Sequence, residues 1–196
     1  MNCHRITALV LILLLTACAT PYSLVEPGEA TVGGMKVTAD GAWNSASAMQ
    51  APYTQKYSQV WTKDGLLLDR LMIFGGVPDG EALFKINSKE AALPVFRSDM
   101  LPNEVAELVE SSIVKILGEG EVAVSISKLR PQLFADQRGA MFDLNAKLSD
   151  GPGYSGMAGG FVAGDKLYLV MFLGAEPYYN VKHRDVAEAI IKSARL

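Results

Sequence analysis

Residues 166–173 read Lys-Leu-Tyr-Leu-Val-Met-Phe-Leu, and every side chain after Lys166 is apolar or aromatic. A strand with apolar side chains on both faces must be covered on both faces, so we expect Leu167–Leu173 to lie in the centre of a β-sheet. Gly164-Asp165 stands directly before this stretch and is typical of a two-residue hairpin turn. The hairpin predicts residues 155–163 as the antiparallel neighbour of the central strand.

Further strands are predicted towards the N-terminus. Apolar and polar residues alternate with a period of two over 122–127 and 140–148, which indicates strands with one covered face. Two more strands, 57–62 and 66–74, are joined at Lys63-Asp64-Gly65, another hairpin signal.

Three shorter features qualify this pattern. The charged pair Asp69-Arg70 interrupts the apolar run 66–74, which indicates either an edge strand or a paired buried contact. The glycine-rich residues 75–80 are expected to end that strand. Residues 35–38 and 83–86 are predicted as short strands.

A helix is predicted over Glu104–Leu117. Apolar residues recur there at steps of three and four and share one face, namely Val105, Leu108, Val109, Ile113, Ile116 and Leu117. Pro102 suits the first helical position and Gly118 the C-terminal stop. A second helix is expected to begin near Lys182 or Asp185. The order of elements predicts an α+β fold, an antiparallel β-sheet with one central amphipathic helix and one C-terminal helix.

The N-terminus has the layout of a secretory leader. Residues 6–15 are predominantly apolar, and ten residues of helix rise only about 15 Å, roughly half of a hydrocarbon core. We therefore interpret residues 1–17 as a signal peptide. Leu15-Thr16-Ala17-Cys18 resembles the lipobox of bacterial lipoproteins, which implies that Cys18 carries a lipid that anchors the chain in a membrane. The alternative is a buried cysteine after a leader-like segment.

The same resemblance implies a location. Ala19 follows the cysteine in place of the Asp that retains lipoproteins in the inner membrane, so the expected destination is the bacterial outer membrane, with the domain facing the periplasm. Residues 18–34 contain several glycines and prolines and are expected to form a tether. Residues 35–196 are expected to form a single domain.

Composition limits the function. The chain has 196 residues, of which 49% are hydrophobic, and a formal net charge of −3. A packed core is therefore expected, and binding to nucleic acid is not. Cys3 leaves with the leader and Cys18 carries the lipid, so the mature chain has no thiol for a disulfide, a nucleophile or a metal site.

The order of elements from Tyr57 to Leu196 resembles the PsbP-like superfamily. The most specific piece is the tail, in which Gly164–Val170 is followed by a helix that ends in Ser193-Ala194-Arg195-Leu196. The resemblance implies a binding or assembly factor and brings no catalytic motif with it.

Catalytic patterns are weak. Gly151–Gly156 has the letters of a dinucleotide-binding loop, but a strand follows it where that site needs a helix. Gly153–Met157 nearly matches the nucleophile elbow of serine hydrolases, with Met157 in place of the last glycine. Ser155 with His183, or a carboxylate pair that includes Asp143, defines the alternative function, an envelope serine or carboxylate-dependent hydrolase. We expect neither a cofactor nor a metal.

The sequence favours a non-enzymatic, membrane-anchored envelope lipoprotein that binds or helps to assemble another envelope protein, or that binds a small hydrophobic ligand. Tyr178 and Tyr179 lie in the loop before the last helix and are the expected partner surface, because amphipathic aromatic side chains are common binding anchors.

Overall fold

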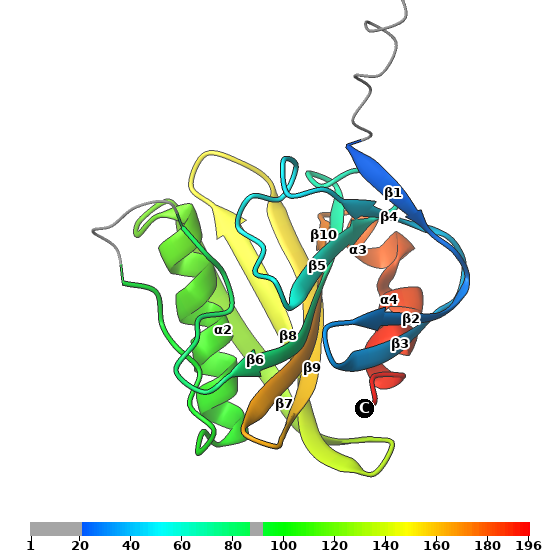
Figure 1. Ribbon diagram of the computed structural model, residues 1–196. Helices are drawn as coiled ribbons and strands as arrows, with labels where there is room; N and C mark the ends of the chain where they lie inside the picture. The colour runs from blue at the N-terminus through cyan, green and yellow to red at the C-terminus, as the bar shows by residue number, and fades with distance from the viewer. Residues whose placement is uncertain (1–20, 87–91) are drawn as a thin grey trace, which may run out of the picture.

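The centre of the molecule is an eight-stranded antiparallel sheet (Figure 1). The structure, a computed structural model, describes residues 21–86 and 92–196. From one edge to the other the strands are β1 (Tyr22–Val25), β4 (Trp43–Ala46), β5 (Ser58–Thr62), β6 (Asp69–Pro78), β10 (Lys166–Ala175), β9 (Gly153–Ala163), β8 (Gln137–Leu148) and β7 (Val122–Phe134).

The central position of β10 is confirmed, because β10 pairs with β6 on one side and with β9 on the other. The predicted turn before it is also confirmed. Gly164 and Asp165 both have positive φ angles, as a tight turn between right-twisted strands requires.

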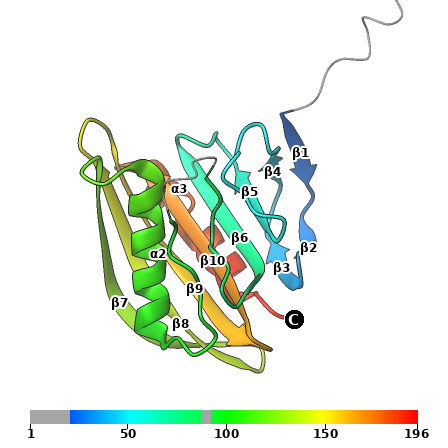
Figure 2. The ribbon, with the colours of Figure 1, turned by 60° about the vertical axis from the view of Figure 1, so that its left-hand side comes forward.

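Helix α2 (Pro102–Leu117) covers one face of the sheet (Figure 2). It begins at the predicted proline, and the carboxylate of Glu104 accepts a hydrogen bond of 2.7 Å from the backbone N–H of Leu101. Most of the predicted apolar face packs on the sheet, including β7 and β8, and on a loop before the helix whose buried members include Leu83, Phe84 and Phe96. This forms the first of two hydrophobic cores. Leu117, predicted on the same face, is 42% exposed.

The opposite face is covered by two elements. One is a hairpin of β2 (Gly28–Val32) and β3 (Met35–Ala39), and the other is α4 (Arg184–Lys192), which follows the short α3 (Tyr179–Lys182). Their buried side chains meet those of the sheet in the second core, which includes Met35, Val37, Ile190 and Ile191. The fold is α+β, as predicted, but richer in sheet than the sequence indicates, and α2 lies on one face of that sheet.

The expectation of a tether at 18–34 is corrected by the structure. Within the described part of this segment, β1 pairs with β4, and β2 pairs with β3. Val32 is buried in the second core. Short strands with glycine and proline carry no recognisable periodicity, and their burial depends on strands far away in the sequence.

Some strand predictions also differ from the structure. β6 continues through Gly75 and Gly76 to Pro78, because Gly76 has a positive φ and takes the extra position of a β-bulge opposite Leu167 and Tyr168. Residues 83–86 belong to no named strand. Among the helices of the described ranges, none is long and apolar enough to cross a membrane.

Candidate functional site: an apolar cavity beside Arg70

Side chains of β6 alternate between the two cores. Leu71 and Ile73 belong to the core beneath α4, whereas Met72 and Phe74 belong to the core beneath α2. Arg70 therefore points to the α2 side, at a place where the pattern of the strand calls for an apolar residue.

A cavity of about 160 Å³ lies beside Arg70, between the C-terminal end of α2 and the sheet. Apart from Arg70, its lining is apolar or aromatic and includes Met72, Ile113, Ile116, Ala146, Leu148 and Leu173. Leu117, which is 42% exposed, is also part of the lining, so the cavity reaches the surface next to the end of α2.

Arg70 has an aromatic neighbour but no anionic one among the described residues. Its guanidinium carbon lies 5.2 Å from the ring centroid of Tyr154, a cation–π distance. The Tyr154 hydroxyl donates a 2.9 Å hydrogen bond to the backbone oxygen of Leu67, which holds the ring in place. Within residues 21–86 and 92–196, the buried Nε of Arg70 has no hydrogen-bond partner, and no carboxylate forms an ion pair with Arg70.

Tyr53 lines the same cavity. Burial raises the pKa of its hydroxyl, whereas the charge of Arg70 and a hydrogen bond with the Arg70 side chain lower that pKa by less, so the net shift is upward. The phenol therefore keeps its proton at neutral pH and is available as a hydrogen-bond donor.

The expected explanations of Asp69-Arg70 do not hold. β6 is an interior strand, and the two side chains point to opposite faces of the sheet. Asp69 is buried, and its carboxylate accepts hydrogen bonds from Thr62 Oγ1 and from the backbone N–H groups of Lys63 and Asp64, at 2.7–3.1 Å. Asp69 thus stabilises the turn before β6, whereas Arg70 faces the cavity.

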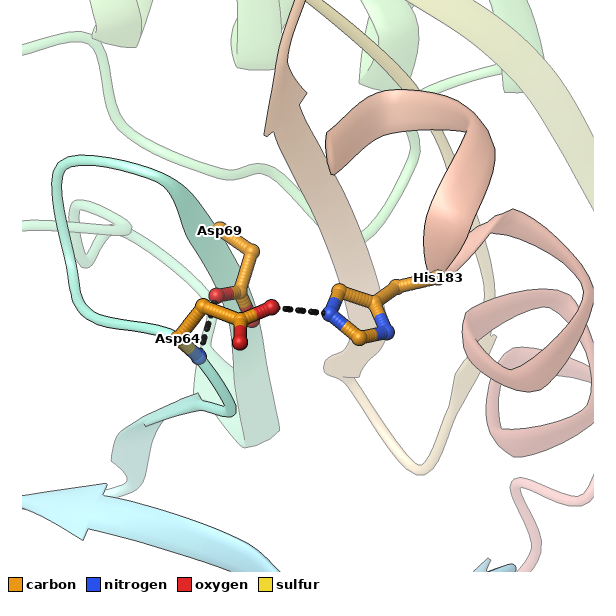
Figure 3. Close-up of side chains that lie close together, drawn as sticks. All are labelled: Asp64, Asp69 and His183. Atoms are coloured by element: carbon orange, nitrogen blue, oxygen red, sulfur yellow. Dashed lines mark hydrogen bonds and ion pairs between the residues drawn. The ribbon is translucent and has the colours of Figure 1, made fainter. Parts of the chain in front are cut away.

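A second polar cluster lies at the end of the sheet where β5 and β6 are joined. Figure 3 shows Asp64, Asp69 and His183, whose ligand-type atoms all lie within 4.8 Å of one another. His183 is buried, and its Nε2 lies 2.5 Å from Oδ2 of Asp64. Lys182 Nζ lies 2.8 Å from the same oxygen, and the hydrogen bonds from His183 and Lys182 lower the pKa of Asp64.

This second cluster joins the turn that contains Asp64 to the C-terminal end of α3 through hydrogen bonds and an ion pair. The ammonium group of Lys182 already stands beside Asp64, where a metal ion would need to bind, and the oxygens of Asp69 accept hydrogen bonds from the turn. Every carboxylate in the group is therefore engaged by the chain itself, and the arrangement serves to hold the loop 63–68 against the helix.

Ser155 and His183, the residues of the alternative serine hydrolase function, have hydrogen-bond partners other than each other. Ser155 Oγ accepts a 2.8 Å hydrogen bond from Asn180 Nδ2, and His183 pairs with Asp64. No hydrogen bond joins Ser155 and His183 in the described part of the chain. The base that a serine nucleophile needs is thus not beside Ser155 in this arrangement.

Asp143 is surrounded by cations. Its carboxylate lies 3.1–3.3 Å from Lys128, Arg130 and Arg184. Burial would raise the pKa of Asp143, but hydrogen bonds from Lys128 and Arg130 together with the charge of Arg184 outweigh burial and lower it. A carboxylate held ionised in this way is a structural ion pair and a poor proton donor.

Of Tyr178 and Tyr179, the expected partner surface, only Tyr178 is largely exposed to solvent. Tyr178 is 61% exposed, whereas Tyr179 packs against the first core. The two rings stand edge to face with centroids 5.1 Å apart. Lys182 Nζ lies 5.6–5.7 Å from both rings. Cys18, the expected lipid attachment site, lies outside the described residues.

Comparison with known proteins supports the fold. The chain is similar to the solution structure of cyanobacterial PsbP (CyanoP) from Synechocystis sp. PCC 6803, with 11% sequence identity and a TM-score of 0.56 over 92% of this chain and 95% of the other. No family model matches the chain, and no curated protein matches it. The fold is therefore PsbP-like, and the similarity extends beyond the segment 57–196 that the sequence indicates.

Proposed function

We propose that this protein is a non-enzymatic, membrane-anchored envelope lipoprotein whose folded part binds a small hydrophobic ligand. The observation that carries the ligand proposal is the cavity beside α2, because its walls are apolar or aromatic except at Arg70. Concave apolar sites with few polar groups are the usual form of small-molecule sites. An envelope protein partner at Tyr178 is the second candidate, favoured by the exposed ring.

The anchor would bring the cavity close to a membrane. Cys18 precedes β1 by four residues, an extended reach of about 14 Å at most. In both views β1 begins at the same end of the molecule as the β8–β9 loop and the C-terminal end of α2, where the cavity lies (Figures 1 and 2). A lipid on Cys18 would thus orient this end towards the outer membrane from its periplasmic side.

Replacing Cys18 by alanine tests the anchor. The variant is expected to lose all lipid modification and to remain as an uncleaved precursor, because the only thiol at the lipobox is gone. Mass spectrometry of the N-terminus of the wild-type and variant proteins from envelope fractions is the measurement. Cys3→Ala is the matched control and should leave the wild-type N-terminus unchanged. An unmodified Cys18 in the wild-type protein, or a mature start elsewhere, contradicts the anchor.

Octanol tests the cavity without involving charge. The full chain in phospholipid nanodiscs is expected to bind radiolabelled octanol saturably, at one site per chain, in equilibrium dialysis against empty nanodiscs. Leu117→Trp should weaken this binding by about tenfold or more, because a larger side chain at the partly exposed end of α2 fills the opening. Leu129→Trp, at another half-exposed leucine outside this cavity, is the control. Equal binding by both variants would place octanol elsewhere.

A further inference from the structure

Arg70 is the one charged side chain among the described residues that line the cavity. A buried guanidinium nitrogen without a partner is costly, and buried polar groups in folded proteins almost always have one. Among residues 21–86 and 92–196, Arg70 has the aromatic face of Tyr154 beside it, but its buried Nε has no acceptor. An acceptor from outside the chain would complete the hydrogen bonding.

We propose that the cavity binds a small anionic amphiphile, with its carboxylate at Arg70 and its alkyl or aryl group between α2 and the sheet. This inference rests on the proposed function and names the chemical class of its ligand. Guanidinium and carboxylate groups match in geometry, since a planar fork of N–H donors meets two oxygens. The apolar walls match the remainder of such a molecule.

The number of charges favours a monoanion. Among the described residues that line the cavity there is one cation, so a single carboxylate is neutralised, whereas a phosphate dianion would keep an uncompensated charge in apolar surroundings. Tyr53 adds a neutral donor beside Arg70 and brings no second charge. A fatty carboxylate therefore fits these groups better than a phosphorylated headgroup.

The volume of the cavity limits the size of the ligand's apolar group. A cavity of about 160 Å³ is close in size to an engineered apolar cavity of about 150 Å³ that binds benzene. A six- to eight-carbon group would fill it, and a longer chain would leave the cavity past Leu117. Octanoate is a suitable probe because it is soluble and has neutral and cationic analogues of the same length.

Equilibrium dialysis with the full chain in zwitterionic phospholipid nanodiscs tests the assignment, with empty nanodiscs as the blank. Octanoate is expected to bind about tenfold or more tightly than octanol, the advantage of one charge-assisted hydrogen bond. Arg70→Gln should remove that advantage and change octanol binding by less than about twofold. Arg70→Glu should reverse the preference, so that octylammonium binds more tightly than octanoate.

Two controls separate this site from others. Arg138→Gln removes a guanidinium from an exposed position on β8, beside a second cavity of about 190 Å³, and should leave octanoate binding unchanged. Inorganic phosphate should not compete with octanoate. Each variant's melting temperature verifies its folding, and Arg70→Leu, which removes the charge and keeps the site apolar, replaces any variant that fails to fold.

The outcomes distinguish this inference from the proposed function. If octanol binds and responds to Leu117→Trp, but octanoate has no advantage or is insensitive to Arg70→Gln, the anion assignment is wrong and the apolar site stands. If neither probe binds saturably, both are wrong. If Arg138→Gln weakens octanoate binding, the carboxylate is not held at Arg70. If inorganic phosphate displaces octanoate, the preference of the site for a monoanion with an apolar group is wrong.

Discussion

Replacement of Val109 by aspartate is expected to lower the free energy of unfolding by about 4 kcal/mol or more. Val109 is 0% exposed and lies on the face of α2 that packs against the sheet. An aspartate there loses the packing of a buried valine and places a carboxylate among apolar side chains. Val109 is preferable to Ile113 for this test, because Ile113 lines the cavity and an aspartate there could pair with Arg70.

Ser111→Asp is the matched control, since it introduces the same side chain on the same helix at an exposed position. It should change stability by less than about 0.5 kcal/mol. Urea unfolding followed by circular dichroism measures both variants. A Val109→Asp protein as stable as the control would show that α2 packs by a different face.

Replacement of Gly75 by alanine is expected to cost about 3 kcal/mol and to release the β2–β3 hairpin from the sheet. A Cβ at Gly75 would lie 1.7 Å from the backbone oxygen of Val32, a contact that requires the backbone to move. The same contact region contains the 2.6 Å hydrogen bond from the N–H of Gly34 to the oxygen of Gly75. The hairpin carries Met35 and Val37 of the second core, so its release exposes apolar surface.

Gly34→Ala is the control for Gly75→Ala. Its Cβ would lie 3.6 Å from its nearest neighbours, an ordinary contact, so the protein should remain within about 1 kcal/mol of the wild type. Hydrogen exchange of the amides of residues 28–39 and the urea m-value are the measurements. Gly75→Ala should accelerate that exchange and lower the m-value. Unchanged protection of the hairpin would contradict the close approach at Gly75.

The elements that the sequence predicted well are those whose signal is local. The fully apolar β10, the turn at Gly164-Asp165 and the amphipathic α2 each depend on the period or conformation of adjacent residues. The opposite holds for β1, a short strand whose partners in β4 lie 18–24 residues away, such as Ala46 for Tyr22. β2 pairs with β3 in a local hairpin, with partners 3–11 residues apart, but its place against the sheet depends on β6, where the N–H of Gly34 donates to the oxygen of Gly75. Local propensity therefore predicted a tether at that position.

The candidate site shows the same limit. The sequence marked Asp69-Arg70 as unusual within an apolar run, and this was the available signal for the cavity. It did not separate the two side chains, although the alternation of a strand sends them to opposite faces. Nor did it bring Tyr53, Ile116 and Leu148 together around Arg70, since these residues come from a loop, a helix and another strand.

The sequence by itself determined the antiparallel α+β class, the central strand and the main helix, because periodicity and turn residues can be read along the chain. A short motif likewise predicts a lipid anchor at Cys18. Only the tertiary structure decided that Ser155 and His183 have different partners, that Asp143 is enclosed by cations, and that Arg70 faces an apolar cavity without an anion in the described chain. The physical reason is that burial and pairing of a side chain depend on residues distant in sequence, which come together only when the sheet is assembled.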